Sequence, residues 1–195
     1  MKSLAEVMRT GRRLRTIGFD DSPFERRRGA PVNLSGIVCS GVRFEGMIWG
    51  LTTKDGLDAT DVIAKMLLES KFHEQVHAVL IDGVAVGGFN IIDLPDLAAR
   101  LDRPCIAVMR KMPNLERVHA AINKLPDPKP RLKILARAGR IHEVGGFIFQ
   151  VVGEKPGVVA RALSKITDRG QVPEPLRIAH LIGAAVKMGQ SGNRA

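Results

Sequence analysis

Apolar residues near the start of the chain recur in short runs, which is typical of strands. Residues 15–20 form a first run that ends in an acidic residue, and residues 33–42 and 44–53 form two longer runs. A polar loop rich in arginine, glycine and proline separates the first run from the second. This spacing predicts one strand with a hairpin beside it.

Three later runs are more uniformly apolar. Residues 77–82 and 105–109 contain almost no polar member, as expected for strands that are buried on both faces of a sheet. Residues 146–152 form a third run, which also predicts a strand.

Apolar residues at helical spacing occupy the segments between and after these runs. They predict helices over residues 58–72, 93–101, 114–125, 131–138, 156–165 and 175–188. This order favours an α/β sheet that is antiparallel at one side and parallel at the other, with helices on its faces. In such sheets, ligands bind at the carboxyl ends of the central parallel strands.

The composition fits one globular domain. Of the 195 residues, 45% are hydrophobic and 26% are charged, so the chain can bury a core without disulfides or a metal. We expect a single domain over residues 1–195, with residues 1–15 as a basic arm and 189–195 as a flexible tail. Its two cysteines lack metal-ligand spacing, and we find neither a membrane span nor a signal peptide, which predicts a cytoplasmic protein.

The charge balance favours an anionic partner. Lys and Arg outnumber Asp and Glu by 30 to 20, and such an excess is typical of nucleic-acid binding, although a merely basic surface is the alternative. Aromatic residues make up only 4% of the chain, and tyrosine is absent, which counts against base stacking on an aromatic platform. The arginines expected to contact nucleic acid flank the first strand: Arg12 and Arg13 before it, and Arg26, Arg27 and Arg28 after it.

Acidic residues follow two of the predicted strands and begin one helix. Asp20 ends the first strand, Asp82 ends the fourth, and Asp58 starts the helix between them. If the first and fourth strands are neighbours, these carboxylates meet at one edge and would bind Mg²⁺, which prefers oxygen ligands and supports phosphoryl transfer. The structural alternatives are a helix N-cap for Asp58 and simple turns after Asp20 and Asp82.

Two further groups of residues lie at the same predicted edge. Gly83, Gly87 and Gly88 do not have the spacing of a phosphate-binding loop, so a tight turn or close ligand approach explains them better than a nucleotide enzyme. Arg110 and Lys111 directly follow the strand over 105–109. They would hold a phosphate there, or else serve as solvated surface charge.

Four segments together resemble the endonuclease dU family, a small prokaryotic group that is a distant relative of endonuclease V. They are IGFDDSPF at 17–24, DGLDAT at 55–60, DGVAVGGFNIIDL at 82–94 and PEPLRIAH at 173–180. The resemblance implies a ribonuclease H-like fold, with a mixed five-stranded sheet and helices on both faces. It also implies a nuclease centre that uses Mg²⁺ or Mn²⁺.

The resemblance also assigns roles to individual residues. Asp20 and Asp82 match the metal-binding aspartates of endonuclease V on its first and fourth strands, and His180 matches a position near the metal. Arg110 falls where endonuclease V has a lysine. On helix geometry alone, His180 would more often be a packing residue.

Two departures from endonuclease V stand out. Its second carboxylate is a glutamate at a helix start, where this chain has DGLDATD; Asp58 is our choice, with Asp55 and Asp61 as alternatives. The wedge that separates strands in endonuclease V is absent, which leaves its hypoxanthine specificity without support here.

The sequence therefore predicts a metal-dependent endonuclease that hydrolyses DNA or RNA at deaminated bases. Asp20, Asp58 and Asp82 would hold the metal, and His180 would assist catalysis. The alternative is a non-catalytic nucleic-acid-binding or interaction protein on the same fold. Nothing in the sequence indicates an oligomeric state.

Overall fold

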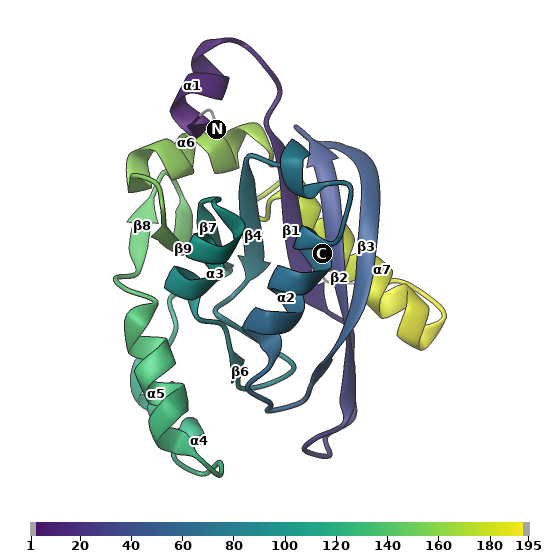
Figure 1. Cartoon of the computed structure of the whole chain (residues 1–195), viewed down its shortest axis with the longest axis vertical. Coiled ribbons are helices and arrows are strands. Elements are labelled where there is room, and N and C mark those ends of the chain that lie inside the picture. The colour runs from purple at the N-terminus through teal and green to yellow at the C-terminus, as the bar shows by residue number, and fades with distance from the viewer. Residues whose placement is uncertain (1–2, 193–195) are drawn as a thin grey trace.

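A seven-stranded mixed sheet forms the centre of the molecule (Figure 1). The structure is a computed structural model that describes residues 3–192. The strands lie in the order β3-β2-β1-β4-β7-β9-β8. Their bounds are β1 Arg15–Asp21, β2 Pro31–Ser40, β3 Arg43–Thr53, β4 Ala78–Asp82, β7 Cys105–Met109, β8 His142–Val144 and β9 Phe147–Val152.

The pairing confirms the predicted mixed sheet. Strands β1, β2 and β3 are antiparallel, whereas β1, β4 and β7 run parallel in the middle of the sheet. The resemblance implied five strands, whereas the run over residues 146–152 already predicted a further one, which is β9. Strands β9 and β8 extend the sheet beyond β7 as an antiparallel hairpin, so the expected count of five was too low. The three residues of β8 are too few to give a sequence signal of their own.

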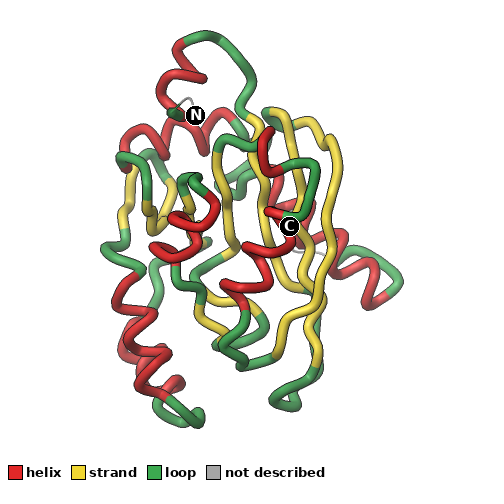
Figure 2. The backbone as a smooth tube through the Cα atoms, viewed as in Figure 1, coloured by secondary structure: helices red, strands yellow, loops and turns green. Residues whose placement is uncertain are grey.

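Helices cover both faces of the sheet, as expected (Figures 1 and 2). Helices α2 and α3 pack on one face, and α1, α6 and α7 pack on the other. The helix bounds are α1 Leu4–Arg9, α2 Ala59–Leu68, α3 Leu94–Leu101, α4 Leu115–Ile122, α5 Pro128–Arg137, α6 Pro156–Lys165 and α7 Glu174–Met188. Two short elements complete the chain: a 3₁₀ turn at His73–Gln75 and a hairpin of β5 (Ala85–Val86) with β6 (Asn90–Ile91).

Alternation along β1 separates the two faces. Ile17 and Phe19 are fully buried in the core under α2 and α3. Residues on the opposite face of the strand therefore point toward α7. Helix α2 ends four residues earlier than predicted, since Phe72 leaves the helix and lies against Gly46 of β3.

The N-terminal arm contains α1 and packs against α6. Leu4, Val7 and Leu14 are buried with the residues of α6. Residues 1–2 of that arm and 193–195 of the expected tail lie outside the described residues. Among the described residues, no helix is long and apolar enough to cross a membrane.

Candidate metal centre

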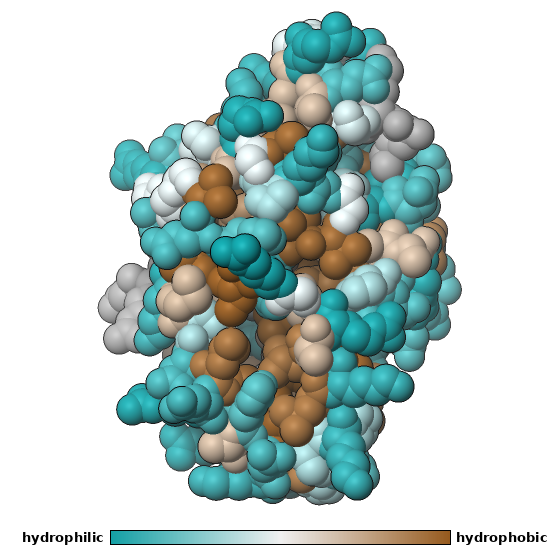
Figure 3. Space-filling view, turned by 90° about the vertical axis from the view of Figure 1, so that its left-hand side faces the viewer, coloured by the Kyte–Doolittle hydropathy of each residue, from teal (hydrophilic) through white to brown (hydrophobic). Residues whose placement is uncertain are grey.

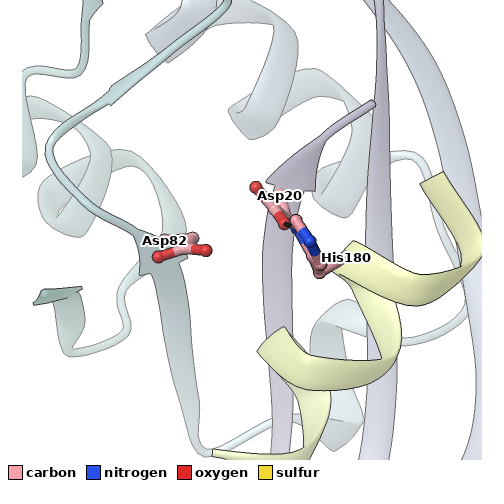
Figure 4. Close-up of side chains that lie close together, drawn as sticks. All are labelled: Asp20, Asp82 and His180. Carbon is pink, nitrogen blue, oxygen red and sulfur yellow. Dashed lines mark hydrogen bonds and ion pairs between the residues drawn. The ribbon is translucent and has the colours of Figure 1, made fainter. Parts of the chain in front are cut away.

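Three side chains meet at the carboxyl ends of β1 and β4. Asp20, Asp82 and His180 each offer a ligand atom, and these atoms all lie within 4.8 Å of one another (Figure 4). The two aspartates come from adjacent parallel strands, in which Phe19 pairs with Ile81. The expected adjacency of the first and fourth strands is therefore confirmed. Helix α7 brings the histidine over the same edge.

Close packing of α7 against the sheet places His180. A Cβ atom on Gly18 would lie 2.8 Å from backbone atoms of Pro175 and Leu176, so only glycine fits at this point of β1. One turn beyond His180, a Cβ on Gly183 would lie 2.9 Å from the Ser22 hydroxyl. The glycines of β1 and α7 thus let the helix lie directly on the strand that carries Asp20.

Both oxygens of Asp20 have partners. Oδ1 accepts a hydrogen bond from the backbone N–H of Asp21 at 2.8 Å, and Oδ2 lies 3.0 Å from Nδ1 of His180. The hydrogen bond with Asp20 raises the pKa of His180 above its usual value, although partial burial opposes this. The pair therefore favours a protonated imidazole when no cation is bound.

Asp82 is partly neutralised by a cation from the next strand. Nη2 of Arg110 donates to Oδ2 of Asp82 at 3.3 Å. Burial, followed by the negative charge of Asp20, nevertheless raises the pKa of Asp82. Arg110 and Lys111 are both exposed at this edge, which is where the sequence placed them.

Asp21 lies next to this group, although the sequence did not single it out. This carboxylate is the last residue of β1, and its Oδ2 accepts a hydrogen bond of 2.5 Å from the backbone N–H of Gly87. Burial raises the pKa of Asp21 to about 7; the Gly87 bond lowers it, and the charges of Asp20 and Asp82 raise it further. The signal was the consecutive Asp20-Asp21 pair, which was interpreted only as a turn.

Asp58 does not join the group, contrary to our expectation. Its Oδ1 accepts from Asn90 Nδ2 at 2.6 Å and from the Thr52 hydroxyl at 3.0 Å, and its Oδ2 accepts from the Thr53 hydroxyl at 2.9 Å. Burial raises the pKa of Asp58, but these hydrogen bonds outweigh it and the pKa is lowered. Both oxygens of the Asp58 carboxylate are thus engaged in hydrogen bonds within the fold.

The structural alternative for Asp58 was a helix N-cap. Asp58 does occupy the N-cap position of α2, but its side chain makes no capping hydrogen bond. Instead, Oδ1 of the buried Asn90 accepts from the N–H of Ala59 at 3.1 Å. Asn90, in the segment over 82–94, therefore links that segment to the DGLDAT turn.

The two other candidates for the second carboxylate are also engaged elsewhere. Asp55 pairs with Lys54 and accepts from the N–H of Phe89 at 2.9 Å. Burial raises its pKa, but these two bonds bring it below the usual value. Asp61 is exposed and pairs with Arg100 at 2.6 Å. Neither belongs to the group of ligand atoms around Asp20.

The structure separates the two sets of arginines. Residues 26–28 lie exposed in the loop after β1. Gly29 and Ala30 of this loop are hydrogen-bonded to Lys54, the residue before the DGLDAT turn. Arg12 and Arg13 precede β1 and are also exposed. A seven-residue strand is about 20 Å long, so these two lie at the opposite edge of the sheet from the site.

The glycine-rich segment after Asp82 is a hairpin, with β5 and β6 paired across Gly87 and Gly88. Both glycines have positive φ, and a Cβ on Gly88 would clash with Asp55. The N–H of Gly87 already donates a hydrogen bond to Asp21. A tight turn therefore accounts for the glycines, as the sequence favoured.

The donor set fits a divalent cation. Two carboxylates and one imidazole lie within reach of a single ion, and oxygen-rich sites of this kind suit Mg²⁺ or Mn²⁺.

Comparison with known proteins confirms the family resemblance. The family model described as Endonuclease dU matches residues 12–187. The chain belongs to this family. A UPF0215 protein of Methanosarcina barkeri is 35% identical over 187 residues, covering 93% of this chain and 95% of the relative. A UPF0215 protein of Archaeoglobus fulgidus is 35% identical over 181 residues, covering 93% and 98%.

Solved structures show the fold of this endonuclease dU family member. A crystal structure of an Archaeoglobus fulgidus protein of unknown function has a TM-score of 0.84 at 34% identity, covering 89% of this chain and 98% of that one. Endonuclease V of Bacillus subtilis has a TM-score of 0.58 at 12% identity, covering 97% and 94%. Ciona intestinalis endonuclease V, in complex with DNA containing an inosine, has a TM-score of 0.55 at 14% identity, covering 87% and 84%. The fold is ribonuclease H-like, as expected.

Proposed function

We propose that this protein is a divalent-metal-dependent endonuclease that hydrolyses phosphodiester bonds in DNA or RNA at deaminated bases. One observation carries the proposal: ligand atoms of Asp20, Asp82 and His180 lie within 4.8 Å of one another at an open sheet edge. Family membership and the endonuclease V fold support it. A cytoplasmic location and a single-domain organisation stay predictions.

The residues at this edge of the sheet would have different roles in hydrolysis. Asp20 and Asp82 hold Mg²⁺ or Mn²⁺, which when bound makes water a better nucleophile and stabilises charge on the leaving oxygen. Arg110 moves from Asp82 to a phosphate oxygen, since its contact with Asp82 is only a single long bond. His180 is oriented through Nδ1 by Asp20 and exchanges a proton at Nε2.

A basic rim would hold the nucleic-acid backbone. Arg26, Arg27 and Arg28 are exposed on the loop after β1, and Arg110 and Lys111 are exposed after β7. Arg110 contacts Asp82 directly, and the loop after β1 begins at the same edge of the sheet, so these cations would attract the phosphates of a bound strand. The DNA bound to the Ciona intestinalis relative supports a nucleic-acid substrate.

A large apolar cavity beside Asp82 would accept the target base. It has a volume of about 800 Å³, and its lining includes Gly83, Phe89, Met109 and Met112. Figure 3 shows apolar side chains gathered around a hollow on this side of the molecule. Cavities of this size hold drug-sized ligands, and His119 and Gln150 in the lining would bind the polar edge of a base.

The test is cleavage of labelled oligonucleotides by the purified protein with Mg²⁺ or Mn²⁺. Substrates contain uracil, hypoxanthine, an abasic site or no lesion, as DNA and as RNA. We expect Asp82→Asn to reduce cleavage by orders of magnitude, whereas Asp96→Asn on the outside of α3 leaves it unchanged. Cleavage that survives Asp82→Asn intact would overturn the proposal.

A second candidate function is nucleic-acid binding without hydrolysis. It is favoured by the absence of Asp55, Asp58 and Asp61 from the ligand group, which leaves two carboxylates where three were expected. This function predicts salt-dependent binding that neither Mn²⁺ nor Asp82→Asn changes. The same oligonucleotides, studied by fluorescence anisotropy, separate the two functions.

A further inference from the structure

Gln150 is the one buried polar side chain that lines the apolar cavity within the described part of the chain. It lies on β9 and is only 5% exposed, whereas the other polar side chains of the lining, His119, Asn123 and Arg140, are exposed. Most of the remaining lining is apolar (Figure 3). A buried amide in such surroundings is costly unless its polar atoms find hydrogen-bond partners.

Alternation along β9 points Gln150 into this cavity. Phe147 and Phe149 are buried in the core under α6, so Gln150 faces the opposite side of the sheet, where α4 and α5 line the cavity. Strand β9 lies two places from β4 in the sheet, which corresponds to about 10 Å. Gly83, the residue after Asp82, lines the same cavity. The cavity therefore extends from Gln150 to the carboxyl end of the strand that carries Asp82.

The orientation of the Gln150 amide is fixed by a backbone carbonyl. Nε2 donates a hydrogen bond to the carbonyl oxygen of Gly139 at 2.7 Å. Because a carbonyl oxygen can only accept, the amide nitrogen must face Gly139, and the two ends of the amide cannot be exchanged. Gly139 follows the C-cap of α5 with a φ of 78°, a conformation that favours glycine. The turn after α5 thus determines which end of the amide faces the cavity.

The oxygen of this amide remains a free acceptor. Oε1 accepts no hydrogen bond from any of residues 3–192, and it is not sealed inside the core. Because Gln150 lines the cavity, Oε1 is open to it. A ligand that fills the cavity should therefore offer an N–H or O–H group at this point.

Deamination creates such a donor in a nucleobase. The pairing edge of adenine presents an unprotonated N1, and that of cytosine an unprotonated N3, so each has a lone pair there. When a carbonyl oxygen replaces the amino group, the ring nitrogen carries a proton, and hypoxanthine N1–H and uracil N3–H become donors. An oxygen acceptor binds these donors and repels the lone pairs of the undamaged bases. Guanine and thymine also have a ring N–H, but their regular pairs cost more to open than the mispairs of deaminated bases.

We propose that Gln150 is a specificity residue of the site, and that its Oε1 accepts a hydrogen bond from the ring N–H of a deaminated base. The proposal rests on the proposed function and names the atom that distinguishes hypoxanthine from adenine and uracil from cytosine. Gly139 is a positioning residue, because its carbonyl holds the Gln150 amide in the orientation that presents oxygen to the base.

Cleavage of matched oligonucleotides by the full chain tests the proposal. Each oligonucleotide carries hypoxanthine, adenine, uracil or cytosine opposite an abasic site, so that base pairing does not differ. We expect wild type to prefer each deaminated base over its parent, and Gln150→Leu and Gln150→Met each to reduce this preference in kcat/KM at least about tenfold. Partial unfolding of a variant would lower both rates equally and leave their ratio unchanged.

Gln75→Leu is the matched control. Nε2 of Gln75 also donates to a backbone carbonyl at 2.7 Å, that of Lys71, but this glutamine is exposed and lies outside the cavity. The control should keep the wild-type base preference.

Fluorescence anisotropy with the same oligonucleotides in EDTA measures base preference without hydrolysis, so the two proposals can fail separately. A wild-type preference that both Gln150 variants keep would overturn the role of Gln150 alone. A binding preference that depends on Gln150, in a chain that cleaves nothing, would support this inference and overturn the proposed hydrolysis. A wild-type chain without base preference in either assay would overturn both this inference and the choice of deaminated bases as substrates.

Discussion

Nδ1 of His180 lies 3.0 Å from Oδ2 of Asp20, although 160 residues separate them in the chain. The contact exists because α7 packs closely on β1 and the residue that follows it. Gly18 lies against Pro175 and Leu176 at the start of the helix, and Gly183 lies against Ser22, directly after the strand. Two glycines, which have no reactive side chain, thus determine how closely the helix that carries His180 approaches the strand that carries Asp20.

We expect Gly18→Ala to lower stability and to displace His180. Its Cβ would lie 2.8 Å from the backbone of Pro175 and Leu176, and backbone cannot turn aside as a side chain can. The overpacking should cost about 1–3 kcal/mol, measured by urea denaturation, and Mn²⁺ affinity should fall in parallel. Gly157→Ala in α6 meets no atom closer than 3.9 Å and should cause neither loss. Equal stability of the two variants would refute the close-packing explanation.

Much of the site follows from patterns that are local in sequence. Asp20 and Asp82 end buried runs, and the ends of neighbouring parallel strands must meet, so their encounter could be predicted. His180 could not be placed by periodicity, because nothing in the pattern of α7 distinguishes a residue that faces a site from one that packs. The family resemblance supplied it.

The errors concern residues whose partners are distant in sequence. Asp58 and Asn90 are 32 residues apart, and no local pattern shows that one satisfies the other. Asp21 was interpreted only as part of a turn, because its partner Gly87 lies 66 residues away.

Asn90→Ala should cost more stability than the loss of a helix cap alone. The variant removes the acceptor of the Ala59 N–H and also a donor to the partly buried Asp58 carboxylate. We expect a loss of about 3 kcal/mol, measured by urea denaturation. The control is Asn114→Ala, which removes only the exposed N-cap of α4 and should cost about 1 kcal/mol. Similar losses in the two variants would show that the link through Asn90 contributes little.

The metal-free protein should lose stability as pH rises from about 6.5 to 8, the range around the raised pKa of Asp21. The pKa of Asp21 is raised from 3.8 to about 7, so the folded chain binds a proton there that the unfolded chain has already released. The pKa of His180 is also raised, and its contribution is likewise lost as pH rises through its folded value. The lowered pKa of His77 acts in the opposite direction, but mainly below this range.

Asp21→Asn should flatten this pH dependence. The carboxylate alone accounts for about 1 kcal/mol over the range, equivalent to roughly 2–4 °C in melting temperature for a chain of this size. Thermal melts in EDTA at several pH values measure it, with Asp96→Asn as the control that keeps the wild-type slope. A variant that keeps the wild-type slope would show that another group titrates over this range.

Nucleic-acid binding should depend on the loop after β1 more than on the arginines before it. Residues 26–28 lie at the same edge as Asp20, whereas Arg12 lies near enough to His77 at the opposite edge to lower its pKa. Replacing Arg26, Arg27 and Arg28 by alanine removes up to three phosphate contacts, which should reduce the slope of log affinity against log salt by about 2–3. Anisotropy with a labelled duplex, in the Asp82→Asn background to prevent cleavage, measures the slope. The Arg12→Ala, Arg13→Ala double variant should change it by less per arginine removed; the reverse order would mean that the backbone approaches from the other edge of the sheet, away from the carboxylates.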